Sequence, residues 1–176
     1  MNRSSILLVL LSLLFLAPPL LGQQAAPPRC DAPEHREFDF WLGRWRVESA
    51  TGQLLGSSVI DSILSGCVLH EQWSGARGLK GESFNVWDRR SKRWHQSWVD
   101  SSGLLLLLDG ARDGNSIRME GEAKRPDGTR VRNRITWTPL AKEDCRGCVR
   151  QLWEQAVGDG EWAVSFEGIY KPETGS

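Results

Sequence analysis

The chain has 176 residues, which is the size of one domain rather than of several. Its 22 lysines and arginines balance its 22 aspartates and glutamates, so the formal net charge at neutral pH is zero. This balance argues against the broad basic surface by which proteins bind polyanions, and we expect no nucleic-acid partner.

The first residues follow the order of a secretory signal peptide. A weakly positive start, Asn2-Arg3, precedes an almost wholly apolar run over residues 6–16, and Gly22 supplies a small residue for cleavage. The apolar run is shorter than the roughly 20 residues that a membrane-spanning helix needs. The sequence therefore predicts a signal peptide at residues 1–22, with cleavage after Gly22 or, as second choice, after Ala25. Export to the periplasm or the medium follows, and an uncleaved anchor is the alternative.

Residues 23–33 are rich in proline, alanine and glutamine, and we interpret them as a flexible leader. Residues 34–42 have the apolar spacing of one or two helical turns, with Phe38, Trp41 and Leu42 facing the core. We assign residues 34–174 to a single folded domain that begins with this short helix.

After Gly43, apolar and polar residues alternate with a period of two almost to the end of the chain. Turn-forming pairs such as Asp127-Gly128 separate the runs. No long helical pattern lies between them, which excludes parallel crossover units. About ten antiparallel strands in one domain must close or stack to remove their edges. The sequence therefore predicts an all-β, antiparallel up-and-down barrel, with strands at 44–50, 57–64, 67–74, 81–88, 94–100, 104–110, 116–123, 129–139, 149–157 and 162–171.

The alternation assigns most tryptophans to one face of these strands and the charged residues to the other. Trp94 and Trp98 share one face, for example, whereas His95 lies on the opposite face. By the same count, Trp162 and Val164 fall on the aromatic face of the last strand. The sequence therefore predicts a barrel with a tryptophan-lined interior.

Several polar side chains share the aromatic face. A buried carboxylate costs several kcal/mol unless it is paired or hydrogen-bonded. These groups therefore line a wet or ligand-filled cavity, or they lie at the mouths of a barrel whose core is filled. They are Glu71, Asn85, Gln96, Asp100, Asn133 and Gln151.

We expect the interior to bind a small, largely apolar molecule without catalysis. The predicted contact area comes from Trp73, Trp87, Trp98, Trp137 and Trp153. The polar end of the ligand is expected at Glu71, Gln96, Asp100, Asn133 and Gln151. Two alternatives stay open. One is an interaction module of the cell envelope with a filled core, and the other is a small hydrolase or isomerase that uses Glu71 or Asp100.

Cofactor chemistry finds little support in the sequence. His70 and His95 fall on the charged face, which argues against haem ligation inside the barrel. No second pair of ligands stands at zinc spacing beside the cysteines, and serine-nucleophile and phosphate-loop motifs are missing. We expect neither a metal nor a cofactor.

Four cysteines in an exported chain favour disulfides, and they allow three pairings. Cys145 and Cys148 form the obvious local pair between two strand-like runs, which leaves Cys30 for Cys67. Free thiols and a redox-active Cys-x-x-Cys site are the alternatives.

The run from Leu104 to Leu108 does not alternate, so half of its side chains must point out of a barrel. We expect the region 34–42 to cover them. A second copy of the chain is the next choice, and a lipid surface is the third.

The motif Gly43-x-Trp45, at the start of the first strand, resembles the Gly-x-Trp signature of the lipocalins and the wider calycin superfamily. The resemblance implies that Trp45 closes one end of the barrel and packs on a basic residue of the last strand, here Lys171. Five further blocks resemble a family of small secreted bacterial proteins with a lipocalin-like barrel and no settled function. That resemblance implies fold and export but no chemistry. The blocks are FDFWLGRW, GCVLHEQW, RWHQSWVDSSG, RITWTPL and VRQLWE.

Overall fold

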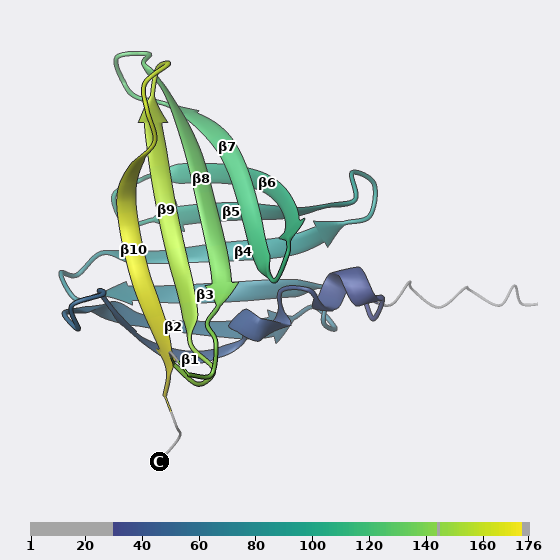
Figure 1. Cartoon of the computed structure of the whole chain (residues 1–176). Coiled ribbons are helices and arrows are strands. Elements are labelled where there is room, and N and C mark those ends of the chain that lie inside the picture. Colours follow the sequence, from purple (N-terminus) through teal and green to yellow (C-terminus); the bar gives the residue numbers. More distant parts are fainter. Residues whose placement is uncertain (1–29, 144, 174–176) are drawn as a thin grey trace, which may run out of the picture.

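The computed structural model describes residues 30–143 and 145–173, so the predicted signal peptide and residues 23–29 of the leader lie outside it. Ten strands form a closed antiparallel up-and-down barrel, as predicted (Figure 1). Each strand pairs with its neighbours in the chain, and β1 also pairs with β10. The strands are β1 Gly43–Glu48, β2 Leu54–Ile63, β3 Val68–Gly75, β4 Lys80–Asp88, β5 Arg93–Asp100, β6 Leu105–Asp113, β7 Ser116–Lys124, β8 Arg130–Pro139, β9 Val149–Val157 and β10 Ala163–Pro172.

Two groups of strands cross steeply in this barrel. In Figure 1, β8, β9 and β10 run across β2, β3, β4 and β5 at a large angle, and the ring closes at the β1–β10 pair. Strand tilt of this kind is what lets a twisted sheet close on itself. The inner faces of the two groups then bound a single core.

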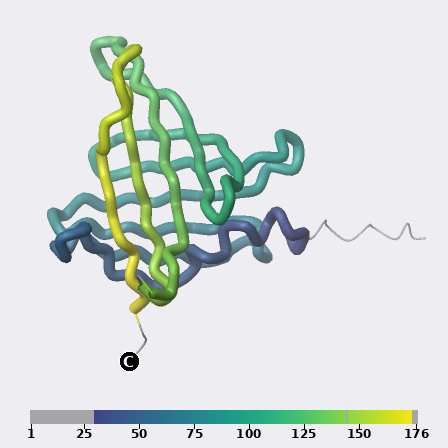
Figure 2. Tube along the Cα trace, viewed as in Figure 1, coloured from purple at the N-terminus to yellow at the C-terminus, as the bar shows by residue number. Residues whose placement is uncertain are grey.

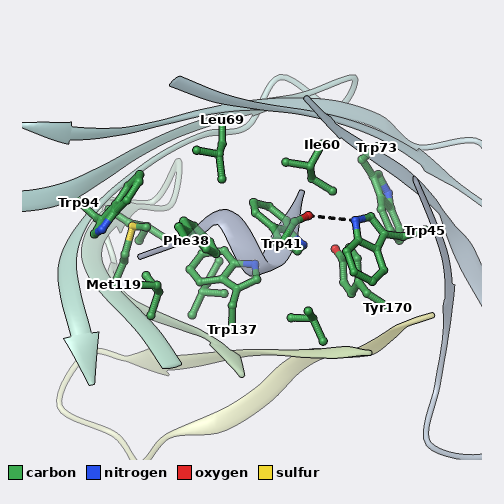
Figure 3. Packing of buried hydrophobic residues seen from close by; sticks show 14 of the residues in the cluster. Phe38, Trp41, Trp45, Ile60, Leu69, Trp73, Trp94, Met119, Trp137 and Tyr170 are labelled. Carbon is green, nitrogen blue, oxygen red and sulfur yellow. Dashed lines mark hydrogen bonds between the residues drawn. The ribbon is translucent and has the colours of Figure 1, made fainter. Parts of the chain in front are cut away.

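The predicted short helix is present as two 3₁₀ turns, η1 Pro33–Arg36 and η2 Asp39–Trp41. The segment enters one end of the ring, where Phe38 and Trp41 are fully buried (Figures 2 and 3). Their rings stack with centroids 5.0 Å apart. The indole Nε1 of Trp45 donates to the Trp41 carbonyl oxygen at 3.0 Å. We call Phe38, Trp41 and Trp45 the aromatic plug, because they fill this end of the barrel.

Trp45 is buried in the core, but its neighbour is not the basic residue that the lipocalin resemblance implies. Lys171 points outward, and its Nζ lies 2.6 Å from a carboxylate oxygen of Glu48 on the outer surface. The adjacent residue, Tyr170, faces inward and contacts Trp45 edge-on, with ring centroids 6.2 Å apart. Alternation along β10 places only one of the two on the core face, and it places Tyr170 there.

The prediction that Trp162 and Val164 face the interior is wrong. The pairing of β9 with β10 shifts between Val164 and Phe166, and such a bulge reverses the face of every residue before it. Val164 is consequently 62% exposed. The Trp162 ring lies on the outer surface against the guanidinium groups of Arg132 and Arg134, 5.2 and 4.3 Å from its centroid.

Half of the leucine side chains in the run do point out of the barrel, as expected. In β6, Leu106 and Leu108 are buried, whereas Leu105 and Leu107 are 56% and 46% exposed. The prediction that residues 34–42 cover the outward leucines is wrong, because that segment packs inside the end of the barrel. The neighbouring strand β5 and the strand beyond it, β4, also carry exposed apolar side chains, Val99 and Phe84.

Both predicted disulfides are present, Cys30–Cys67 and Cys145–Cys148, and the described residues contain no free cysteine. The first ties the segment before the plug to the β2–β3 turn. The second lies in the connection between β8 and β9, as a loop staple would.

Candidate functional site

The half of the barrel away from the plug contains a cavity of about 140 Å³. An apolar cavity of closely similar volume in another protein is large enough to bind benzene. The strands β3, β5, β6, β8, β9 and β10 and the β3–β4 turn supply its walls. It is lined by Glu71, Trp73, Leu79, Gln96, Trp98, Leu106, Ile135, Gln151, Trp153, Phe166 and Tyr170.

Two strand glycines give the tryptophan rings their places in this half. A Cβ atom added at Gly56 of β2 would lie 2.8 Å from the Trp73 ring, and one at Gly81 of β4 would lie 2.4 Å from the Trp98 ring. Both distances are below van der Waals contact, so any side chain there would push the ring out of place. Glycine in a strand commonly marks such a close approach.

Glu71 of β3 is the carboxyl group of the cavity, and it is only 4% exposed. Ser58 on β2 donates to its Oε1 at 3.1 Å, and Ser83 on β4 donates to its Oε2 at 2.9 Å. The Ser83 oxygen in turn accepts from Asn85 Nδ2 at 2.9 Å, and the Asn85 oxygen accepts from Gln96 Nε2 at 2.8 Å. This donor chain, from Gln96 through Asn85 and Ser83, directs its N–H and O–H dipoles toward the carboxyl group.

Burial raises the pKa of Glu71 to about 7, although the hydrogen bonds from Ser83, Ser58 and Tyr170 act in the opposite direction. Within the described residues, no lysine, arginine or histidine pairs with this carboxyl group. At neutral pH, therefore, the cavity contains a carboxyl group that gains and loses its proton readily.

Tyr170 lies beside Glu71 on the β10 wall. Its hydroxyl donates to the Gln151 side-chain oxygen. Burial raises the pKa of Tyr170 well above its usual value, and the nearby Glu71 carboxyl adds to the rise. Because the phenol has one proton, it can donate a hydrogen bond either to Gln151 or to an ionised Glu71. A protonated Glu71 would instead donate to the phenol oxygen.

The polar ends of two wall tryptophans are engaged outside the cavity. Trp98 Nε1 donates to Asp100 Oδ2 at 3.4 Å, and Trp153 Nε1 donates to Asn133 Oδ1 at 3.0 Å. Neither Asp100 nor Asn133 lines the cavity. These bonds hold the indoles in position and leave their carbon atoms for contact with a bound molecule.

A second cavity of about 230 Å³ lies toward the β7–β8 turn. Leu106 and Trp153 line both cavities, so the Trp153 side chain lies where the two adjoin. The second cavity contains Asn133, whose side-chain oxygen accepts from Gln155 Nε2 at 2.9 Å as well as from Trp153.

Only some of the residues predicted to form the binding site line the cavity. The cavity brings together Glu71, Trp73, Gln96, Trp98, Gln151 and Trp153. Asp100 and Asn133 support Trp98 and Trp153 from behind. Trp137 is fully buried against Phe38 of the plug, with ring centroids 5.2 Å apart. Trp87 packs against Trp94 at the plugged end.

Asp100 has a local structural role. It lies at the β5–β6 turn and accepts from the backbone amides of Ser102 and Leu104. Partial burial acts to raise its pKa, but the hydrogen bonds from Ser102, Leu104 and Trp98 hold that pKa below its usual range. Asp100 is therefore an ionised turn residue, and Glu71 is the carboxyl group suited to proton chemistry.

Sequence reasoning missed several residues of the site. Alternation along the last strand places Tyr170 and Phe166 on the inner face, as the structure does. The same strand begins with the bulge that made the prediction for Trp162 wrong. Ser58 and Ser83 also face inward by alternation, which is an unusual position for a hydroxyl unless it has a partner. Two inward serines on β2 and β4, the strands on either side of Glu71, could have indicated that they bond to its carboxyl group.

The described helices include none long and apolar enough to cross a membrane. Residues 30–143 and 145–173 also contain no cluster of three or more histidine, cysteine or acidic side chains at metal-binding distance. Comparison of the chain with protein families and with curated proteins finds no match. The class is therefore defined by the structure itself. It is a closed ten-stranded antiparallel barrel with an aromatic plug in one half and an aromatic, carboxyl-bearing cavity in the other.

Proposed function

We propose that this protein is an exported binding protein for a small, largely apolar molecule, and that the ligand occupies the Glu71 cavity. The observation that carries the proposal is the cavity itself. One half of the barrel interior is filled by the plug, whereas three indoles and a buried carboxyl group bound an open space in the other half. Binding sites commonly combine apolar walls with a few placed polar groups in this way.

The volume of the cavity limits the size of the ligand that it can hold. About 140 Å³ suits one small ring or a short branched chain, and a fatty acyl chain would have to displace Trp153 and enter the second cavity. Two disulfides support export, because such bonds persist in oxidising compartments. The Gly43-x-Trp45 motif and its role in the plug support a place for this chain among lipocalin-like proteins.

The test is tryptophan fluorescence titrated with a series of probes of increasing size, from benzyl alcohol to decanol. We expect saturable quenching by the small members and weak or no binding of the long ones. Trp98→Ala should weaken binding, because it removes a wall of the cavity. The matched control is Trp162→Ala, which removes a tryptophan from the outer surface. If no probe quenches the wild-type protein saturably, the proposal fails.

A proton-transfer enzyme is the second candidate, favoured by the position of Glu71 beside Tyr170 and by its pKa of about 7. A base that titrates near the working pH is the useful kind for removing a proton from carbon. Incubation of bound carbonyl probes in D₂O tests it. Exchange of a C–H proton that the wild type catalyses and Glu71→Gln does not would support catalysis, and equal exchange in both would exclude it.

A further inference from the structure

We propose that the molecule bound in this cavity is a small organic cation of the alkylammonium type. Its charge would lie against Glu71, and its alkyl groups would contact Trp73, Trp98 and Trp153. The inference rests on the proposed binding function and adds the chemical class of the ligand.

The first argument is charge. The Glu71 carboxyl is almost fully buried, and every hydrogen bond that it receives comes from a neutral hydroxyl. A buried carboxylate without a counter-charge is costly, so such groups are normally paired with a cation. The described part of the chain supplies no basic partner for Glu71. A cationic ligand would supply one at the position that the cavity leaves open.

The second argument is the direction of the hydrogen bonds. The donor chain from Gln96 through Asn85 to Ser83 ends at Glu71, and Ser58 donates to the other carboxyl oxygen. Such an arrangement favours the ionised form, since each donor is oriented toward negative charge. These bonds offset part of the cost of burial, and a cation in the cavity would offset the remainder.

The third argument is the nature of the walls. Trp73, Trp98 and Trp153 line the cavity together with Glu71, and tryptophan is the best aromatic partner for a cation. The N–H groups of Trp98 and Trp153, which form the positive edges of their rings, are bonded outside the cavity. These two N–H groups are therefore not directed at a positive charge in the cavity, and the rings line its wall.

The volume agrees with this class of ligand. A trimethylammonium group has fewer non-hydrogen atoms than benzene, which fits a cavity of closely similar volume in another protein. A long polyamine would exceed the space. Choline is therefore a suitable probe, and 3,3-dimethylbutan-1-ol is its uncharged counterpart, in which a carbon atom replaces the nitrogen.

Cation binding should be linked to protons. The groups that face Glu71 are Ser58 from β2, Ser83 from β4, Gln96 from β5, Gln151 from β9 and Tyr170 from β10. Only Tyr170 among them titrates, and its pKa lies far above neutrality. Glu71 must lose its proton when the cation binds. The affinity should therefore be constant above about pH 7 and fall by up to tenfold per pH unit below it.

The experiment is isothermal titration calorimetry of the wild-type protein with choline and with 3,3-dimethylbutan-1-ol at pH 8 and at pH 6. We expect choline to bind at least tenfold more tightly than the alcohol at pH 8 and the difference to shrink at pH 6. Titrations at pH 7 in buffers of different ionisation enthalpy should show that choline releases protons and that the alcohol does not.

Glu71→Gln provides the matched variant, since the amide keeps the size of the side chain and removes its charge. It should lose the preference for choline over the alcohol. Equal binding of the two probes by the wild type, or binding of the alcohol alone, overturns the cation and leaves the proposed binding function standing. If neither probe binds but neutral ring probes do, the cation is again excluded. If no probe of any kind binds, both proposals fall.

Discussion

The two halves of this barrel are built from the same alternating aromatic strands, yet one is filled and the other is open. In the filled half, Phe38 and Trp41 enter from a segment that precedes the first strand and occupy the space between the walls (Figure 3). In the open half, the described lining residues belong to the strands except for Leu79 of the β3–β4 turn, and the polar side chains there bond to one another around Glu71. The comparison teaches that inward alternation alone does not fill a barrel. An additional segment fills one half, and the other half contains a cavity.

The largest expected effect is at the plug. Trp41→Ala should lower the free energy of unfolding by about 3–5 kcal/mol, because it deletes a fully buried ring and leaves a cavity. Trp98→Ala in the open half should cost clearly less, since part of that ring already faces a space. Urea denaturation followed by circular dichroism measures both. Equal losses would mean that the two halves are equally filled.

The two disulfides sharpen the comparison, because only one of them ties the plug segment to the barrel. The Cys30–Cys67 bond spans a sequence separation of 37, and the Cys145–Cys148 bond spans 3. The chain-entropy model gives about 4 kcal/mol for the long loop and about 2 kcal/mol for the short one. In urea denaturation, the double variant Cys30→Ser/Cys67→Ser should therefore be less stable than the double variant Cys145→Ser/Cys148→Ser. A larger loss from Cys145→Ser/Cys148→Ser would contradict this order.

The open half should respond to pH through Glu71. Its pKa is about 7 in the folded protein and near the ordinary 4.5 in the unfolded chain, so the folded state takes up the proton first as the pH falls. The free energy of unfolding should therefore gain about 3 kcal/mol from this group between pH 8 and pH 4, and that gain is lost as the pH rises through 7.

The pKa values of Asp88, Asp100 and Asp127 are lowered, so these groups act on stability in the opposite direction to Glu71 as the pH falls. The difference between the wild type and Glu71→Gln isolates the buried group. We expect Glu71→Gln to be the more stable protein at pH 8 and to lose that advantage at pH 5. A difference that does not change with pH would show that Glu71 titrates normally.

The filled half was largely predictable from the sequence. The apolar spacing of Phe38 and Trp41 predicted that their segment faces the core, where both are fully buried. The resemblance of Gly43-x-Trp45 to the lipocalin signature implied that Trp45 lies at the end of the barrel. The strand bounds followed from alternation. Trp162 was misplaced because a bulge adds one residue without changing the pattern of side-chain types.

The open half was predictable only in part. The alternation along the strands placed Glu71, Gln96 and Trp98 inside the barrel. It does not say which of the two ends of the barrel an inward residue approaches. Trp137 and Trp87 were therefore grouped with the pocket, although the structure places them at the plugged end. Hydrogen-bond partners across strands depend on register, and register is set by turns and bulges that the sequence marks weakly.

The smallest effect we predict is at the start of the donor chain. Gln96 Nε2 donates to Asn85 Oδ1 at 2.8 Å, and Gln96→Leu removes this bond while keeping a side chain of similar size in the cavity wall. The stability cost should be about 1–3 kcal/mol, because the buried Asn85 oxygen is left without its donor. The variant also weakens the polarisation that reaches Glu71 through Asn85 and Ser83, so the pKa of Glu71 should rise further. The pH midpoint of cation binding should therefore move upward. Gln155→Leu is the matched control, because its amide bonds to Asn133 in the neighbouring network. An unmoved midpoint in Gln96→Leu, or an equal shift in both variants, would show that the donor chain does not tune Glu71.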